Sequence, residues 1–210
     1  RVKPWGTNHA VMMGKDVIKE PFGIVNCDDF YGRDTFKVMG KFLSELPEGS
    51  KNTYAMVGFR VGNTLSDSGT VSRGICTTDE KNHLQGVVER TKIQRMDGEV
   101  KYIDDNGEWA ATPETTPVSM NFWGFTPWIF GKLEEYFATF LKGLAPDAIK
   151  AECLLPVFVD ELMHEGELTV PMLTTDAVWF GVTYKEDKPF VQAELRKLHE
   201  SGVYPASLHE

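Results

Sequence analysis

The chain has 210 residues, of which 41% are hydrophobic and 11% aromatic, which is ample for one core and thin for two full domains. We therefore expect residues 1–210 to form one domain. The chain carries 22 basic and 31 acidic side chains, and its formal net charge of −9 argues against binding along a DNA or RNA backbone. Small phosphorylated ligands stay compatible with this charge, because backbone amides or a divalent cation can reverse the local field.

The cysteines and the apolar runs indicate a cytoplasmic protein. Cys27, Cys76 and Cys153 are an odd number without CxxC spacing, which predicts neither a disulfide framework nor a structural zinc site. A reducing compartment fits this pattern best. The longest apolar runs, such as 22–25 and 154–159, are far shorter than the ~20 residues that a membrane-spanning helix requires. The sequence therefore predicts no membrane segment.

The first quarter of the chain alternates between helix and strand patterns. Apolar residues at helical spacing predict helices over 8–18 and 33–46. Short apolar runs predict buried strands over 22–25 and 54–61. This alternation favours a layered α/β sheet.

From residue 71 the pattern changes to short strands and then to mixed elements. Strands are expected over 71–76, 84–89 and 93–103, and Asp97-Gly98 predicts a hairpin turn within the last of these, which favours antiparallel additions to the sheet. Residues 104–117 are rich in Asp, Glu, Thr, Pro and Gly and are expected to form an exposed loop. The other expected elements are strands over 118–126, 168–173 and 177–182 and helices over 127–142, 156–164 and 189–201.

Two adjacent carboxylates follow the first expected strand. Asp28 and Asp29 stand at its carboxyl end, which is where open α/β sheets bind ligands. Paired carboxylates there suit a hard cation such as Mg²⁺. Side chains alternate along a strand, so only one of the two is expected to be a primary magnesium ligand. The alternative is a solvated turn that caps the following helix.

Other polar residues have a functional and a structural interpretation. Gly6 and Thr7 offer backbone amides and a hydroxyl to an anion or a base edge, or else they only cap a helix. Glu89 beside Arg90 suits sugar hydroxyls and a phosphate, or else forms a surface ion pair. Asn121 lies within an aromatic run, where it needs a hydrogen-bond partner or a ligand. Asp187 follows a strand-like segment and either reaches the same sheet edge or belongs to a solvated loop.

Five segments in the same order resemble the sugar-phosphate nucleotidyltransferases, the sugar-nucleotide pyrophosphorylases of the nucleotide-diphospho-sugar transferase fold. Any single segment is only moderately specific, whereas the ordered set covers almost the whole chain. The later segments are similar to a bacterial branch of the family. The five segments span residues 3–11, 22–32, 88–92, 120–125 and 179–187.

The resemblance implies a fold and an activity. The fold is a three-layer α/β Rossmann-like arrangement with a mixed, mostly parallel sheet. The activity is Mg²⁺-dependent transfer of a nucleotidyl group from a nucleoside triphosphate to a sugar 1-phosphate, which gives a nucleotide sugar and pyrophosphate. The α-phosphorus is attacked in line by the sugar phosphate, so catalysis is mostly positioning and charge neutralisation.

Residue roles follow from the resemblance position by position. Gly6 and Thr7 match residues that approach the nucleotide base, and Asp28 matches the aspartate that holds magnesium on the α-phosphate. Gly74 and Asn121 match sugar-site residues. Glu89 and Arg90 match a Glu-Lys pair that holds a sugar hydroxyl and the sugar phosphate, with arginine here in place of lysine.

Two departures from the family pattern leave alternatives open. The family's N-terminal strand and glycine-rich loop, which cradle the triphosphate, have no counterpart before Lys3. The family's second metal ligand is an aspartate after a Trp-containing strand, where this chain has Phe180-Gly181-Val182, and Asp187 is the nearest substitute. A non-catalytic module that binds nucleotide sugars and an inactive fragment of the enzyme are therefore the alternative hypotheses. The nucleotide, the sugar and the oligomeric state are left open.

Overall fold

The computed structural model describes residues 3–145, 147–182, 184–205 and 207. Its helices are α1 (Thr7–Met12), α2 (Arg33–Glu45), α3 (Ile129–Gly143), α4 (Leu155–His164) and α5 (Asp187–Glu200), with a 3-10 turn at Val61–Asn63. Its strands are β1 (Phe22–Ile24), β2 (Asp29–Phe30), β3 (Ala55–Arg60), β4 (Val71–Thr78), β5 (Leu84–Met96), β6 (Glu99–Ile103), β7 (Trp109–Thr112), β8 (Pro117–Phe125), β9 (Met172–Thr174) and β10 (Phe180–Gly181). Among these helices none combines the length and the apolar character needed to cross a bilayer.

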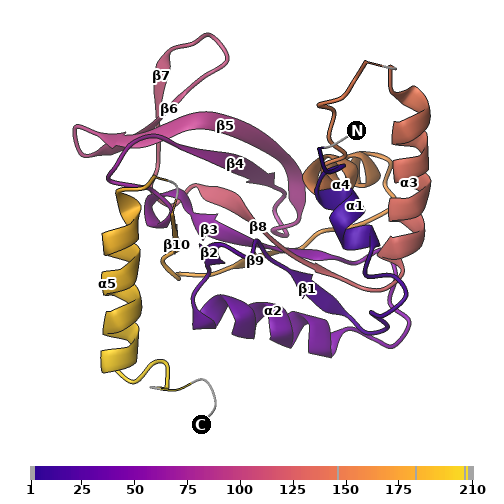
Figure 1. Ribbon diagram of the computed structural model, residues 1–210, viewed down its shortest axis with the longest axis horizontal. Coiled ribbons are helices and arrows are strands. Elements are labelled where there is room, and N and C mark those ends of the chain that lie inside the picture. The colour runs from indigo at the N-terminus through magenta and orange to yellow at the C-terminus, as the bar shows by residue number, and fades with distance from the viewer. Residues whose placement is uncertain (1–2, 146, 183, 206, 208–210) are drawn as a thin grey trace.

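The main sheet is mixed and mostly antiparallel (Figure 1). Its strand order is β7-β6-β5-β4-β8-β3-β9, and β1 pairs with β8 in addition. Among the ladders of the described strands, β3–β9 is parallel and the others are antiparallel. The predicted three-layer Rossmann-like fold with a mostly parallel sheet is therefore wrong.

The strand β8 explains why the parallel prediction fails. β1 and β3 run in the same direction, as a strand-helix-strand crossover through α2 requires. β8 lies between them, however, and is antiparallel to both. The chain then adds β4, β5, β6 and β7, and these pair antiparallel in sequence order.

Local signals account for the other differences from the predicted elements. Asp97 and Gly98 have φ angles of 54° and 82° and form the expected turn between β5 and β6. The expected loop 104–117 contains β7, which pairs with β6 through Tyr102 and Ala110. The helix predicted over 8–18 ends at Met12 and continues as turns.

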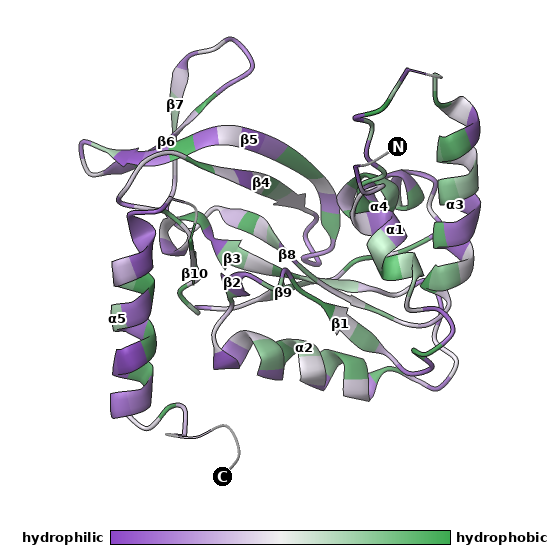
Figure 2. Ribbon diagram, viewed as in Figure 1, coloured by the Kyte–Doolittle hydropathy of each residue, from purple (hydrophilic) through white to green (hydrophobic). Residues whose placement is uncertain are grey.

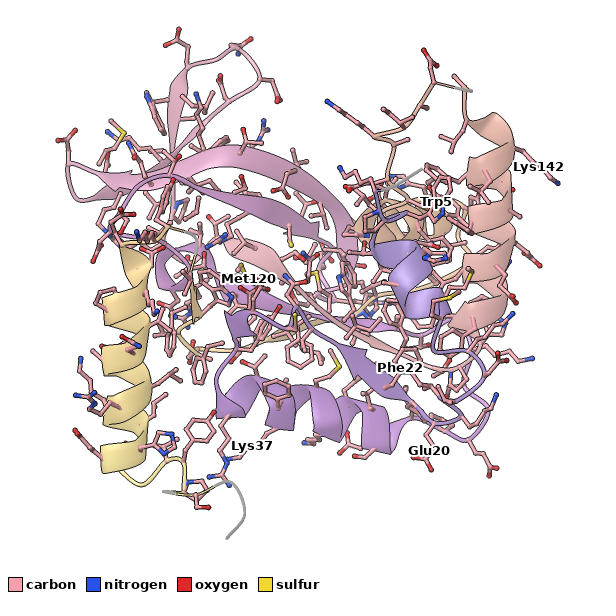
Figure 3. The ribbon with its side chains drawn as sticks, in the orientation of Figure 1. Trp5, Glu20, Phe22, Lys37, Met120 and Lys142 are labelled. Carbon is pink, nitrogen blue, oxygen red and sulfur yellow. The ribbon has the colours of Figure 1, made fainter. Side chains whose placement is uncertain are left out.

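The sheet forks along one edge of β8. β1 pairs with the carboxyl-terminal part of β8, ending at Ile24 opposite Trp123, whereas β4 pairs with the amino-terminal part, where Gly74 lies opposite Ser119. Met120 lies between these two ladders, near the centre of the molecule (Figure 3). Strand ends that separate in this way leave space for a ligand between them.

Apolar side chains pack on both faces of the sheet. Alternate residues along β3 point to opposite sides, so Met56 and Tyr54, the residue before the strand, join one core cluster and Val57 and Phe59 join the other. The first cluster packs beneath α1, α3 and α4, and the second packs against α2. Figure 2 shows apolar residues concentrated in the central strands, between α2 and the group of α1, α3 and α4. Both faces of the fork are therefore held by packed helices.

The carboxyl-terminal segment is attached to β2, the strand that begins at Asp29. β10 pairs antiparallel with β2, with Gly181 opposite Asp29. The rings of Phe30 and Phe180 are stacked with centroids 4.2 Å apart. α5 stands at the side of the molecule opposite α3 (Figure 1). The segment before α5 therefore forms a wall at the fork.

Candidate functional site

A polar cavity of about 330 Å³ lies at the fork of the sheet. Its wall combines residues that follow β1, residues of β4, β5 and β8, and residues around β10. The lining residues are Asn26, Asp28, Asp29, Ser72, Arg73, Gly74, Val87, Glu89, Ser119, Met120, Asn121, Pro156, Trp179 and Val182. We call this space the polar cavity.

A second cavity of about 490 Å³ adjoins it on the side of α1 and α4. We call this space the apolar cavity, because aliphatic side chains and Trp123 form most of its wall. Its lining residues are Thr7, Ala10, Val11, Ile24, Val25, Asn26, Val87, Glu89, Asn121, Trp123, Leu154, Leu155, Pro156, Val157 and Asp160. Asn26, Val87, Glu89, Asn121 and Pro156 line both cavities, so the two are halves of one cleft.

Asp28 and Asp29 both line the polar cavity. The Oδ2 atom of Asp29 accepts hydrogen bonds from Asn26 Nδ2 at 3.0 Å and the Tyr31 hydroxyl at 3.3 Å. Asp28 makes no hydrogen bond or ion pair with the described part of the chain, and its carboxylate is exposed. The structure thus places one fixed and one available carboxylate at the carboxyl end of β1.

Gly181 leaves room for the Asp29 carboxylate. A Cβ atom at position 181 would lie 2.9 Å from Asp29 Oδ1 and 2.9 Å from the Trp179 ring. A side chain there would therefore displace one of these neighbours.

Gly74 and Glu89 face each other across β4 and β5, where they are paired. A Cβ atom on Gly74 would lie 2.5 Å from Val87 Cγ1 and 3.6 Å from Glu89 Oε2, so the glycine keeps the cavity wall open next to this carboxylate. Partial burial raises the pKa of Glu89, and the nearby Arg73 charge opposes that rise.

Asn121 lies at the fork in a left-handed backbone conformation, with φ 59°. Its side chain is exposed and lines both cavities, rather than being buried in the aromatic run. Its backbone N–H donates to Ser119 Oγ at 3.2 Å. Asn is among the residues that adopt this conformation at low cost. The bend therefore turns its amide into the cleft.

Gly6 and Thr7 lie beside the segment that leads into α4. The Thr7 hydroxyl accepts a hydrogen bond from the Leu155 N–H at 2.9 Å, and Thr7 lines the apolar cavity. Gly6 has φ 103°, and a Cβ atom there would lie 2.5 Å from the Cys153 carbonyl oxygen. Trp5, beside α3 in Figure 3, accepts from the Cys153 N–H at 2.7 Å. Gly6 is required by this close backbone approach.

The structure places Arg90 away from the cleft. Side chains alternate along β5, so Val87 and Glu89 face the cleft, whereas Arg90 lies on the other face. There its guanidinium makes a bidentate contact with the Asp105 carboxylate and lies over the Tyr102 ring at 5.2 Å. Arg90 and Glu89 therefore do not line the same cavity in this structure.

The structure also separates the two predicted metal ligands. Asp187 lines a different cavity of about 270 Å³, together with Ser66 and Trp179. It accepts hydrogen bonds from Ser66 Oγ at 2.9 Å and from the Tyr184 N–H at 2.8 Å. These contacts fasten the start of α5 to the loop before β4. Asp187 and Asp28 thus do not line one cavity.

Arg73 is a charged residue of the polar cavity that the sequence prediction missed. It is 8% exposed and its guanidinium carbon lies 4.4 Å from the centroid of the Trp179 ring. Arg73 is paired with Arg90 and Gly74 with Glu89, so the side chain of Arg73 leaves β4 on the face opposite Gly74, and both residues line the cavity at the fork. The available signal was a single arginine within an otherwise uncharged strand, Val71-Ser72-Arg73-Gly74-Ile75-Cys76.

The donor atoms at the end of β1 fit a magnesium ion. Among the described residues no group of three His, Cys, Asp or Glu side chains could hold a metal ion. Mg²⁺ is usually bound by one or two carboxylates, with water and substrate phosphates completing its coordination. Asp28 and Asp29, both hard oxygen donors on an open cavity, meet that requirement.

The three cysteines differ in accessibility, which allows a direct check of this part of the structure. Cys27, between Asn26 and Asp28, is exposed, whereas burial raises the pKa of Cys76 to about 12 and that of Cys153 to about 11. We expect a maleimide to label one thiol rapidly in the native protein and all three in urea. Peptide mass mapping should place the rapid label on Cys27; rapid labelling of Cys76 would contradict the packing of β4.

The sequence matches no protein-family model and no curated protein. Comparison of the structure gives a different result, because 115 chains of solved structures match it. One of them is the inositol-1-phosphate CTP transferase from T. maritima, with a TM-score of 0.55 and 12% sequence identity. The match covers 93% of this chain and 63% of that chain, so the present chain spans less than two thirds of the neighbour's length. The fold therefore resembles that of this transferase.

Proposed function

We propose that the cleft catalyses Mg²⁺-dependent transfer of a nucleotidyl group from a nucleoside triphosphate to a sugar 1-phosphate. One observation carries this proposal. Thr7, Asp28, Gly74, Glu89 and Asn121, which the resemblance selected from separate segments, line the two halves of one cleft. The likeness to a nucleotidyltransferase fold supports the same reaction class.

The chemistry of the two cavities supports a division of the substrates between them. A nucleotide base has large apolar faces and a polar edge, which suits the apolar cavity with Val11, Leu155 and the Thr7 hydroxyl. A sugar needs several hydrogen-bonding groups, which the polar cavity offers through Glu89, Ser119 and Asn121. The phosphates would then lie between them, near Asp28.

In the proposed reaction an oxygen of the sugar phosphate attacks the α-phosphorus of the triphosphate. A new P–O bond forms, the bond to pyrophosphate breaks, and pyrophosphate leaves with the electron pair. Asp28 and Asp29 would hold Mg²⁺, which supplies charge neutralisation on the α-phosphate. Glu89 and Asn121 would orient the sugar so that the attacking oxygen lies in line with the leaving group.

The experiment that tests this proposal is an assay of pyrophosphate release. The purified protein is incubated with Mg²⁺, each of the four common nucleoside triphosphates and a panel of sugar 1-phosphates. We expect one pair to give pyrophosphate and a nucleotide sugar in equal amounts. Binding of a nucleotide sugar without turnover of any pair would instead support a non-catalytic binding module.

Gly74→Ala tests the assignment of the sugar to the polar cavity. The added Cβ must displace the Val87 side chain next to Glu89, so the cavity becomes narrower at the point assigned to the sugar. We expect KM for the sugar 1-phosphate to rise about 10-fold, while KM for the nucleotide changes by less than about 2-fold. An equal rise in both constants would contradict the division between the two cavities.

A further inference from the structure

The polar cavity contains a buried cation that is only partly satisfied by the protein. A guanidinium carries five N–H donors. Within the described chain, Arg73 uses Nη1 to donate to the Ser72 carbonyl at 2.7 Å and Nη2 to donate to the Thr64 carbonyl, and its Nε atom is buried without a partner. Each terminal nitrogen of Arg73 therefore keeps a second N–H that is not used within the described chain, and Arg73 lines the cavity.

The Arg73 side chain is held in place, but its charge is not neutralised by an ion pair within the described chain. Its guanidinium lies over Trp179, and no carboxylate of the described residues lies within ion-pair distance of it. Asp29 and Glu89 are near enough to interact with it electrostatically. Burial lowers the pKa of Arg73 to about 10, which these two carboxylates partly oppose, so the side chain stays charged at neutral pH.

A fixed guanidinium of this kind suits an anionic ligand group. Phosphate oxygens accept planar, paired N–H donors from arginine, and a side chain already held by two carbonyls and an aromatic ring loses little freedom when it binds. Arg90, to which the resemblance assigned this role, is paired with Asp105 and does not line the polar cavity. Arg73 is thus the cation that the structure places at the cavity wall.

We infer that Arg73, held over Trp179, binds the phosphate of the sugar 1-phosphate acceptor and determines the requirement for an anionic acceptor. The inference rests on the proposed function, because it names the residue that recognises one of its substrates. It assigns to β4 a role that the resemblance had assigned to Arg90 of β5.

The test measures binding of α-D-glucose 1-phosphate, α-D-mannose 1-phosphate, N-acetylglucosamine 1-phosphate and inorganic phosphate by calorimetry, with glucose as the uncharged comparison. The variants are Arg73→Met, Arg73→Lys and Arg90→Met. Arg95→Met is the matched control, because Arg95 forms a half-exposed ion pair with Glu114. Thermal unfolding of each variant is recorded first.

We expect Arg73→Met to weaken sugar phosphate binding at least 30-fold and Arg73→Lys to weaken it about 3- to 10-fold, because lysine keeps the charge but not the planar donors. Arg90→Met and Arg95→Met should stay within about 2-fold. If Arg73→Met unfolds, the inference is tested with Arg73→Lys. Unchanged sugar phosphate binding in Arg73→Lys, together with a loss of binding in Arg90→Met, overturns the inference. Equal losses for glucose and its phosphate, or no binding of any phosphate by the native protein, also overturn it.

Binding and turnover are measured separately, so the two proposals fail in different ways. Loss of sugar phosphate binding in Arg73→Met without any pyrophosphate release from the native protein would support the role of Arg73 and contradict nucleotidyl transfer. Pyrophosphate release by the native protein, with an unchanged KM for the sugar 1-phosphate in Arg73→Met, would support nucleotidyl transfer and contradict the role of Arg73.

Discussion

Asp28→Asn is expected to lower the rate of pyrophosphate release by about 100-fold or more, with little change in thermal stability. Asp28 is exposed at the end of β1, makes no contact within the described chain that the substitution would break, and lines the polar cavity. The amide removes one negative charge while keeping the shape of the side chain. The loss should therefore come from weaker magnesium binding rather than from unfolding.

The dependence of the rate on Mg²⁺ concentration distinguishes weaker magnesium binding from unfolding. The concentration of Mg²⁺ that gives half of the maximal rate should rise at least 10-fold in Asp28→Asn. Asp176→Asn is a suitable control, because Asp176 forms an ion pair with Arg60 at 2.7 Å and lines another cavity. An unchanged magnesium requirement in Asp28→Asn, or an equal loss in Asp176→Asn, would remove Asp28 from the proposed mechanism.

Phe125→Ala is expected to destabilise the protein by about 3–5 kcal/mol, the usual range for deleting a buried phenyl ring. Phe125 is fully buried at the end of β8, with its ring centroid 4.8 Å from that of Tyr54 and 6.1 Å from that of Phe22. β8 joins β1, β3 and β4, so a cavity at this position weakens the strand that holds the fork together.

Phe36→Ala provides the matched control for this prediction. Phe36 lies on α2 and is 51% exposed, although its ring contacts Phe122 at 5.1 Å. We expect a loss of about 1 kcal/mol or less, because most of this ring is already in water. Urea unfolding followed by tryptophan fluorescence measures both variants. Similar losses in the two would show that β8 is not the central strand of the core.

Local patterns in the sequence predicted most elements, whereas they could not predict how the strands pair. The apolar run at 22–25 and the Asp97-Gly98 turn both correspond to observed features. The position of β8 between β1 and β3 depends on contacts between segments about 65 and 100 residues apart, which no local periodicity encodes. Helix-strand alternation favoured a layered α/β sheet, and the resemblance implied that this sheet is mostly parallel; that prediction is wrong, because all ladders of the described strands except β3–β9 are antiparallel.

In the candidate site, too, some residues could be predicted from the sequence and others depend on contacts between distant segments. Asp28, Gly74 and Glu89 were selected by type and by resemblance, and all three line the polar cavity. Arg90 was selected because it matches the lysine of a Glu-Lys pair, whereas neighbours in a strand point to opposite faces and Arg90 does not line the cavity. Arg73 was missed because its place at the cavity wall depends on the fork between β1 and β4 and on Trp179 from a distant segment.

The most direct test of the central claim is a crystal structure of the protein with Mg²⁺ and the nucleotide sugar identified by the pyrophosphate assay. The base should lie in the apolar cavity beside Thr7, the sugar beside Gly74 and Glu89, and the phosphates between them near Asp28. A ligand in the cavity lined by Arg60 and Asp176, or in the cavity lined by Asp187, would contradict the proposed function of the fork.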